Sequence, residues 1–421
     1  MTEKDERVEE FKLEKDSEFR FELVDHSTGH LEILDGMAEV FGTELVKARK
    51  YVFDKGTKAS VYTWHGCHIK LTGKTEVAYI SKDTPMVMYV NMHVALEQMR
   101  MNAEKERVRG PRVMVVGPAD SGKSTVCRLL LNYAVRIGRT PVFIDLDVGQ
   151  SDVSIPGTIG ALTVERPADV EEGFNQCAPL VFHYGHVTPA TNLKLYNILV
   201  SRIADVVNMK CDASKKANLS GIIVNTGGWV RGAGYDSLKH AAGSFEVDLI
   251  IVMYEERLYT ELKKDMPEFV RLVLLPKSGG VVVRSQSYRG DARERKVREY
   301  FYGPRNNLFP HTFEVKFSEV KLFKIGAPTL PDSCLPLGMK SQDNKTKIVP
   351  VQPSTSLVHH VFSVSNANSP EENLIEINVL GFIVMVEINL EKQCFTVLSP
   401  SPRPLPKSIL LQFDMQFIDI Q

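Results

Sequence analysis

Net charge of either sign is nearly absent from this sequence. Its 51 lysines and arginines are balanced by 52 aspartates and glutamates, which gives a formal net charge of -1 at pH 7. A protein with so little net charge cannot attract a polyanion through its overall field. Any nucleic-acid site must therefore be a local groove rather than a generally basic surface.

Cysteines and long apolar segments are also scarce. The six cysteines are scattered among 421 residues and form no C-x-x-C pair, which argues against a zinc or disulfide framework and favours reduced thiols. No apolar run approaches the roughly 20 residues that a membrane helix needs. The charged first ten residues lack the apolar segment of a signal peptide. We therefore expect an intracellular protein, cytoplasmic or nuclear.

The pattern of strand and helix signals divides the chain into three parts. Residues 1–98 contain short alternating segments separated by glycines, which predicts an N-terminal β domain resembling a sandwich. Residues 99–305 alternate strand and helix signals, which predicts an α/β domain with a mostly parallel sheet wrapped by helices. Residues 306–421 return to β signals, which predicts a small β-rich C-terminal domain interrupted by a loop-rich stretch over 326–356. The central strands are expected at 112–116, 141–147, 180–184, 221–225, 247–253 and 270–275, and helices at 91–107, 123–137, 190–208, 235–243 and 256–266.

The most informative stretch that is present is 117–125, which reads G-x-x-x-x-G-K-[ST]. A β-branched segment precedes it and a helix-like segment follows it, and this is the context of a nucleotide-binding P-loop. In such a loop backbone N–H groups surround phosphates at a helix N-terminus. Lys123 would reach the β- and γ-phosphates of ATP, and the Ser124 hydroxyl would hold Mg²⁺. The alternative is a glycine-rich turn that only happens to end in Lys-Ser. The nucleotide-binding candidates in the loop are Asp120, Ser121, Gly122, Lys123, Ser124 and Thr125.

Two aspartates end the next predicted strand, 141–147. Asp145 and Asp147 are two residues apart, so on a strand they would face the same side. One could bind Mg²⁺ through water and the other could accept a proton from an attacking hydroxyl. The alternative is that both only begin a turn. Gln150 follows at loop distance and could orient substrate or water.

An arginine-rich stretch, 284–298, follows a glycine pair at 279–280 that could act as a hinge. Arg289, Arg293 and Lys296 are spaced i, i+4 and i+7, which places them on one helical face. Guanidinium groups on a mobile helix suit a lid that closes on the phosphates being transferred. The alternative is a solvated basic helix that is paired with its own glutamates.

Two loops that follow predicted strands are candidates for binding the phosphate acceptor. The segment 183–192 contains Thr188 and Thr191 and leads into a helix, whose N-terminus could bind an anion. The segment 225–232 contains Trp229, one of only two tryptophans. This side chain could stack on a nucleobase, or it could belong to the core.

Over nearly its whole length the chain resembles the eukaryotic RNA 5′-hydroxyl kinase subunits of pre-mRNA cleavage complex II, which also associate with the tRNA-splicing endonuclease. The resemblance implies a central P-loop kinase domain, ATP and Mg²⁺ as cofactors, and a nuclear location. It also implies action in tRNA splicing and pre-mRNA 3′-end processing, with RNA 5′-hydroxyl ends and subunits of both complexes as partners. The matching stretches are 63–67, 117–125, 145–150, 154–158, 165–173, 188–189, 298–303 and 401–406.

The resemblance implies roles for individual residues. Glu18 and Lys58 match residues of the N-terminal domain that help to hold the nucleotide, and Asp147 matches the residue that activates the RNA hydroxyl. Asp145 and Ser124 are then the metal candidates, although the residues alone leave open which aspartate contacts the metal. The remaining matches are Gln150, Thr188, Thr191 and Trp229 near the acceptor end, and Arg284, Arg289 and Arg293 in the lid.

Two other functions compete with that of an RNA kinase. An ATP-binding scaffold with little or no turnover would keep the nucleotide motif, but the lid arginines and Trp229 would be superfluous to it. A regulatory GTPase is disfavoured because no N-K-x-D follows a strand after the P-loop.

Overall fold

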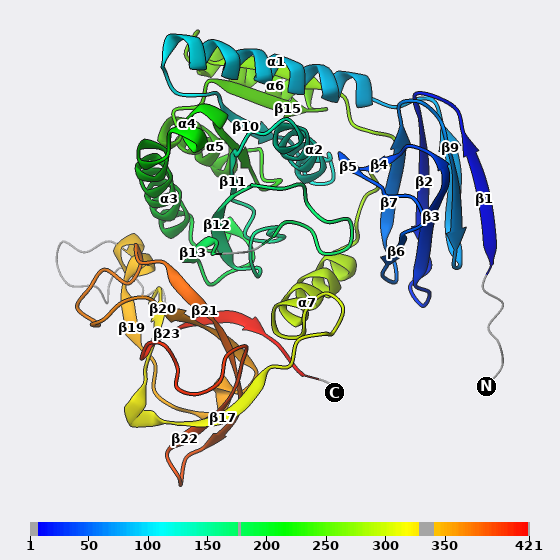
Figure 1. The fold of residues 1–421 in the computed structure, drawn as a ribbon. Helices are drawn as coiled ribbons and strands as arrows, with labels where there is room; N and C mark the ends of the chain where they lie inside the picture. Colours follow the sequence, from blue (N-terminus) through cyan, green and yellow to red (C-terminus); the bar gives the residue numbers. More distant parts are fainter. Residues whose placement is uncertain (1–6, 176–177, 328–340, 420–421) are drawn as a thin grey trace.

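The computed structural model describes residues 7–175, 178–327 and 341–419, and it divides into two β-rich parts flanking an α/β part (Figure 1). This confirms the fold class expected from the sequence. The loop-rich stretch expected over 326–356 lies partly outside the described residues. Among the helices of the described ranges, none combines the length and apolar character that crossing a membrane requires.

The N-terminal part is a sandwich of two antiparallel sheets around an aromatic core that includes Phe19, Phe21 and Phe53. Strands β1 and β8 were not predicted, although Cys67, Ile69 and Leu71 of β8 alternate with half-buried residues and point into the core. One sheet has the order β1 (Val8–Leu13), β8 (Cys67–Thr72), β3 (Gly29–Gly36), β6 (Lys50–Phe53). The other has the order β5 (Thr43–Glu44), β4 (Glu39–Val40), β7 (Lys58–Thr63), β2 (Ser17–Leu23), β9 (Thr75–Ser81).

The central part is built on a seven-stranded sheet that is parallel except at β12. The six strands expected from the sequence are all present, and β12 was missed. Gly160 and Ala161 at its centre disfavour a strand and weaken the signal from Thr158, Ile159 and Thr163. The order is β13 (Leu180–His183), β12 (Thr158–Thr163), β11 (Val142–Asp145), β14 (Ile222–Asn225), β10 (Arg112–Val116), β15 (Leu249–Met253), β16 (Arg271–Leu275).

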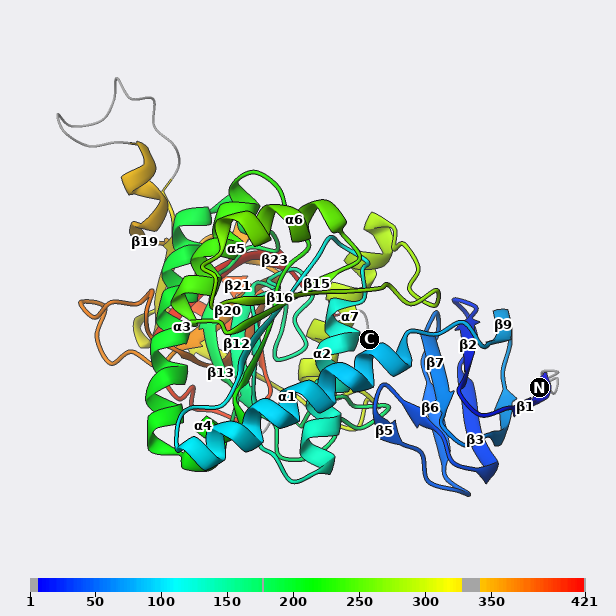
Figure 2. The same cartoon turned by 90° about the horizontal axis from the view of Figure 1, so that it is seen from above.

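Helices cover both faces of this sheet because the buried side chains of each strand alternate between two cores. Val113 and Val115 of β10 pack with α1 and α2, whereas Met114 and Val116 pack with α3 and α5. Helix α1 begins earlier than expected and joins the N-terminal sandwich to the central part (Figure 2). The helices of this part are α1 (Met86–Glu106), α2 (Lys123–Arg136), α3 (Leu193–Ala213), α4 (Lys215–Ser220), α5 (Ala233–Ser244), α6 (Glu256–Asp265) and α7 (Gln286–Tyr302).

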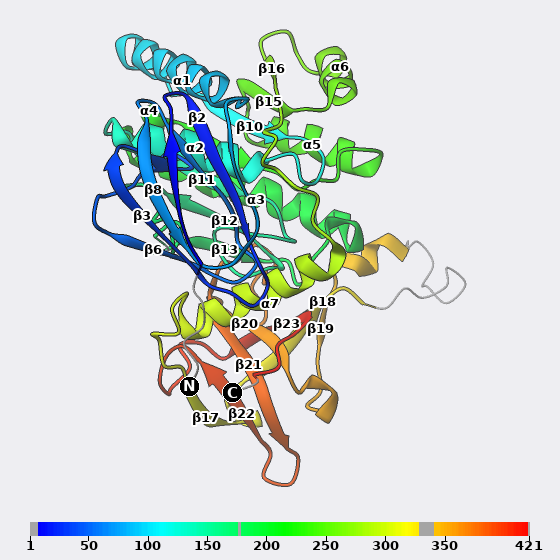
Figure 3. The ribbon, with the colours of Figure 1, turned by 90° about the vertical axis from the view of Figure 1, so that its right-hand side faces the viewer.

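The C-terminal part is a second seven-stranded sheet, and α7 lies between it and the central part (Figure 3). Val297 and Phe301 of α7 are buried against Phe382 and Phe413 of this sheet. Strands β18, β19 and β20 were not predicted. The order is β17 (His311–Lys316), β22 (Cys394–Ser399), β21 (Val379–Asn389), β20 (His360–Ser365), β23 (Ile409–Gln416), β18 (Lys321–Ile325), β19 (Ile348–Pro350).

Candidate active site

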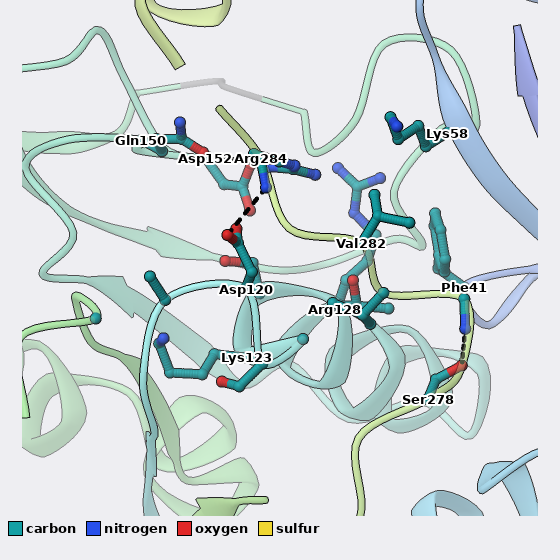
Figure 4. Close-up of a pocket in the computed structure, with 18 of the residues that line it drawn as sticks. Phe41, Lys58, Asp120, Lys123, Arg128, Gln150, Asp152, Ser278, Val282 and Arg284 are labelled. Carbon is teal, nitrogen blue, oxygen red and sulfur yellow. Dashed lines mark hydrogen bonds between the residues drawn. The ribbon is translucent and has the colours of Figure 1, made fainter. Parts of the chain in front are cut away.

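A cavity of about 780 Å³ lies where the central sheet, the N-terminal sandwich and α7 meet (Figure 4). The carboxyl ends of parallel strands face this edge of the sheet, which is where ligands bind in such folds. Of the site residues expected from the sequence, all but Thr191 and Asp145 line the cavity. Those that line it are Glu18, Lys58, Asp120, Ser121, Gly122, Lys123, Ser124, Thr125, Asp147, Gln150, Thr188, Trp229, Arg284, Arg289 and Arg293.

The loop between β10 and α2 has the backbone that a phosphate-binding loop needs. Gly122 precedes α2 with φ +91°, a left-handed conformation that favours glycine. Lys123 is buried, and its Nζ donates to the carbonyls of Gly117 at 2.8 Å and Pro118 at 2.7 Å. Burial lowers the pKa of Lys123, against the raising effect of the Asp147 carboxylate. The ammonium group is thus held inside the curve of the loop.

The two aspartates after β11 differ in position and surroundings. Asp145 ends the strand, and Asp147 lies beyond it in a turn, so the expectation that both lie on a strand and face the same side is wrong. The Asp147 carboxylate lines the cavity and accepts from the backbone N–H of Gly149 at 2.9 Å and of Gln150 at 3.2 Å. Burial raises the pKa of Asp147, although these backbone donors and Lys123 oppose the shift. A half-buried carboxylate that is held by its backbone and has a raised pKa has the properties of a general base.

Asp145 is fully buried beneath the cavity. Its carboxylate accepts from the backbone N–H of Asp152 at 2.7 Å and of Asp147 at 3.1 Å, and from the Asn225 amide at 3.0 Å. Burial, followed by the charges of Asp152 and Asp147, raises the pKa of Asp145 to about 8. The Asn225 amide also lies 3.3 Å from the Ser124 hydroxyl, so one side chain connects both metal candidates. Asn225 was not predicted from the sequence, because only the sheet order brings it beside them.

These oxygen donors fit a Mg²⁺ ion. Mg²⁺ in phosphoryl-transfer sites takes one or two protein oxygens and completes its shell with waters and phosphate oxygens. Ser124 supplies a hydroxyl at the cavity wall, and the Asp145 carboxylate lies behind it. In the described residues no group of three or more His, Cys, Asp or Glu side chains forms a metal cage. An ion here would therefore depend on phosphate and water ligands.

The arginine-rich segment is tied directly to the P-loop. The Asp120 carboxylate accepts from the Arg284 backbone N–H at 3.1 Å (Figure 4). It also accepts from the Arg289 guanidinium at 2.6 Å. The Arg284 guanidinium donates to the Gln150 side chain at 3.3 Å. Helix α7 begins after Ser285, whose hydroxyl caps it by accepting from the Tyr288 N–H at 3.1 Å.

The basic face of α7 points at the cavity. Arg289, Arg293 and Lys296 all line it, as their helical spacing predicts. Lys296 also forms an ion pair with Glu299 of the same helix at 3.5 Å. The alternative of a solvated basic helix expects such pairs. The arrangement places at least two guanidinium groups where phosphates would lie.

The N-terminal sandwich closes the cavity on the side opposite the central sheet. Glu18 is buried and forms an ion pair with Arg20 at 2.9 Å, and Lys58 bonds to Glu22. The Arg20 guanidinium packs so closely on the glycine pair 279–280 that a Cβ on Gly279 would lie 2.8 Å from it. Phe41 of the sandwich and Arg128 of α2 also line the cavity, and neither was predicted from the sequence.

On the acceptor side the local structure differs from the expected helix start. Pro189–Thr191 form a short 3-10 turn, and α3 begins only at Leu193, capped by the Asn192 side chain. Thr188 lines the main cavity, and Thr191 lines a smaller cavity beside it. Trp229 is half-buried and lines the main cavity rather than a hydrophobic core.

Models of known families match three consecutive parts of the chain. Residues 12–103 match the N-terminal beta-sandwich domain of polyadenylation factor. Residues 117–303 match the mRNA cleavage and polyadenylation factor CLP1 P-loop. Residues 308–419 match the pre-mRNA cleavage complex II protein Clp1.

Curated relatives match over almost their full length. Polyribonucleotide 5′-hydroxyl-kinase Clp1 of Gallus gallus is 60% identical over 415 residues, covering 99% of this chain and 98% of the relative. The human protein of the same name is 61% identical over 411 residues, covering 98% and 97%. A solved structure of the wild-type Clp1p–Pcf11p complex covers 99% of both chains with a TM-score of 0.86 and 23% identity, a likeness of fold.

Proposed function

The chain belongs to the Clp1 family of pre-mRNA cleavage complex proteins, and from this premise we propose that it is an ATP-dependent kinase that phosphorylates the 5′-hydroxyl end of RNA. One observation carries the proposal. The P-loop lysine, Asp147 and the basic face of α7 all line one cavity. A scaffold that only bound ATP would not need a carboxylate and a set of guanidinium groups around the phosphate site.

The proposed reaction assigns a step to each of these groups. Asp147 takes the proton of the RNA 5′-hydroxyl while the 5′ oxygen forms a bond to the γ-phosphorus of ATP and the bond to the leaving ADP oxygen breaks. Lys123, Arg289 and Arg293 offset the charge spread over the transferring group, where preorganised donors contribute most. Mg²⁺ bound at Ser124, with Asp145 behind it, would neutralise phosphate charge.

The proposal extends to the nucleotide and to the acceptor. Glu18, Lys58 and the P-loop would hold ATP, with Arg284 over its phosphates. Gln150, Thr188, Thr191 and Trp229 would hold the end of the RNA. All of these residues except Thr191 line the same cavity, which supports the assignment.

We also propose that the protein acts in the nucleus, in pre-mRNA 3′-end processing and in tRNA splicing. The family descriptions and the solved Clp1p–Pcf11p complex support a partner in the cleavage complex. Association with the tRNA-splicing endonuclease rests on the resemblance of the sequence motifs.

Transfer of label from γ-labelled ATP to a 5′-hydroxyl oligoribonucleotide tests the proposed reaction. Lys123→Ala should abolish transfer, because the ammonium stabilises charge on the phosphates in the transition state. A circular dichroism melt should match that of the wild type, since Lys123 bonds only within its own loop. ATP binding without transfer by the wild type would instead identify a scaffold.

A further inference from the structure

A second cavity lies directly beyond the lid helix, between the central part and the C-terminal sheet. Its volume is about 250 Å³. Val187 and Arg293 line both this cavity and the main one, so the two cavities adjoin. We call it the lid-side cavity; it is lined by His186, Val187, Thr191, Arg293, Asp414 and Met415.

The C-terminal sheet contributes an organised polar group to this cavity. Asp414 of β23 lies 2.5 Å from His186 Nδ1 and accepts from Lys324 Nζ of β18 at 2.8 Å. The Gly185 carbonyl accepts from the Asp414 backbone N–H at 3.0 Å, which fixes the strand beside the loop. Because Asp414 engages only Nδ1, the other ring nitrogen of His186 is the one that can bond to a ligand. The His186 side chain is 11% exposed.

The chemistry of the lid-side cavity suits a nucleotide of a polyanionic chain. Arg293 is the cation of the lining, and Lys324, which pairs with Asp414 at 2.8 Å, offsets the charge of the one carboxylate in that lining. Thr191 and His186 add hydrogen-bonding groups, whereas Val187 and Met415 add apolar surface. A protein with a net charge of -1 must bind RNA through such a local groove.

We propose that the lid-side cavity binds the RNA chain downstream of its 5′-terminal nucleotide, with a backbone phosphate near Arg293 and Lys324. The inference rests on the proposed kinase function, which places the 5′ end in the main cavity by Thr188 and Trp229. A chain leaving that end past Val187 and Arg293 enters the lid-side cavity. The C-terminal domain then takes part in substrate binding, and its contribution appears only with RNA long enough to reach it.

Kinetics with 5′-hydroxyl oligouridylates of two and eight nucleotides test this inference. His186→Ala and Lys324→Gln should raise the KM for the octamer by about tenfold and leave the KM for the dimer unchanged, because only the octamer reaches the cavity. Lys324→Gln should also reduce the salt slope of octamer binding by about one. Lys321→Gln is the matched control, since Lys321 is exposed on the same strand, whereas Lys324 is the lysine whose Nζ contacts Asp414 of the cavity.

Equal losses for dimer and octamer, or an unchanged octamer KM in both variants, would overturn the inference. If His186→Ala does not fold, Lys324→Gln decides alone, because it changes a side chain that is 40% exposed. If the wild type transfers no phosphate, the proposed function fails. In that case fluorescence anisotropy with a labelled octauridylate still measures RNA binding at the lid-side cavity. Variants that bind the octauridylate as tightly as the wild type does would overturn the inference.

Discussion

Asp147 illustrates how a single side chain is prepared for chemistry. It stands beyond the end of β11, is bonded by the backbone of its own turn, and faces the cavity with Lys123 nearby. Asp145, two residues earlier, is bonded by three N–H donors below the surface. The turn, rather than the strand, therefore separates a carboxylate that can meet substrate from one that supports it.

Asp147→Asn tests the role of this carboxylate. The amide oxygen can still accept from the Gly149 and Gln150 N–H groups, so the turn should survive. We expect kcat to fall about 10²-fold or more, the scale for a lost general base, with ATP affinity changed by less than about tenfold. Single-turnover transfer and equilibrium ATP binding measure the two quantities. A collapse of ATP binding would make Asp147 a metal ligand.

Trp229→Ala tests stacking on the acceptor. The indole is half-buried at the cavity wall, so we expect the RNA KM to rise about 10-fold to 100-fold, equivalent to roughly 1–3 kcal/mol of stacking. The ATP KM should stay constant when each substrate is varied in turn. Trp64→Ala is the control, because the other tryptophan packs against a core and does not line the cavity. If both variants behave alike, Trp229 has only a structural role.

At the scale of elements, the P-loop is tied to α7 and to the segment before it. The segment 278–284 contributes to the cavity lining, and Asp120 binds this segment at the Arg284 backbone and binds α7 at the Arg289 guanidinium. Asp120 itself has a positive φ of 55°, which places its carboxylate at this junction. The other end of α7 is anchored by Val297 and Phe301 in an apolar core. The basic face of α7 is thus held between an ionic contact and a hydrophobic one.

Asp120→Asn should loosen the first of these contacts. The amide oxygen can still accept from the Arg284 N–H, but the ion pair with Arg289 is lost. Since the Asp120 side chain is only 11% exposed, we expect kcat to fall about tenfold, a larger effect than on the ATP KM. Asp236→Asn, which removes an exposed carboxylate paired with Lys239, is the control. An increased kcat would show that Asp120 competes with phosphate for Arg289.

At the scale of the whole molecule, one carboxylate joins the N-terminal sandwich to two distant segments of the central part. Glu171 of the central part pairs with Arg49 of the N-terminal sandwich at 3.4 Å, and it also pairs with Arg305 after α7. It accepts from the Val52 backbone N–H of the sandwich at 2.5 Å as well. Its side chain is 7% exposed, so these contacts are shielded from solvent. The position of the sandwich over the cavity depends partly on this group.

Glu171→Gln should lower the thermal midpoint of unfolding by a few degrees, because two arginines lose a shielded partner. Differential scanning calorimetry at neutral pH measures the shift. Glu172→Gln is the matched control. Glu172 also contacts Arg305, at 3.6 Å, but its side chain is 48% exposed. Equal shifts for both variants would mean that burial at Glu171 contributes nothing.

The sequence by itself determined the P-loop, the strands and helices around it, and the three-part organisation. These features depend on short stretches of chain, because glycines fix the loop and the spacing of apolar residues fixes strand and helix. Strand β12, with Gly160 and Ala161 at its centre, carried too weak a local signal. The helical spacing of Arg289, Arg293 and Lys296 was likewise readable, since one helix presents them on one face.

Only the tertiary structure decided which distant groups meet. Asn225 reaches Ser124 and Asp145 because β14 lies between β10 and β11, an order that no local pattern contains. Asp120 meets Arg289 across 169 residues, and His186 meets Asp414 across 228. Such pairs form when whole helices and strands pack together. The free energy of that packing comes mainly from the burial of apolar surface, which is non-directional, and not from the polar residues that the packing brings together.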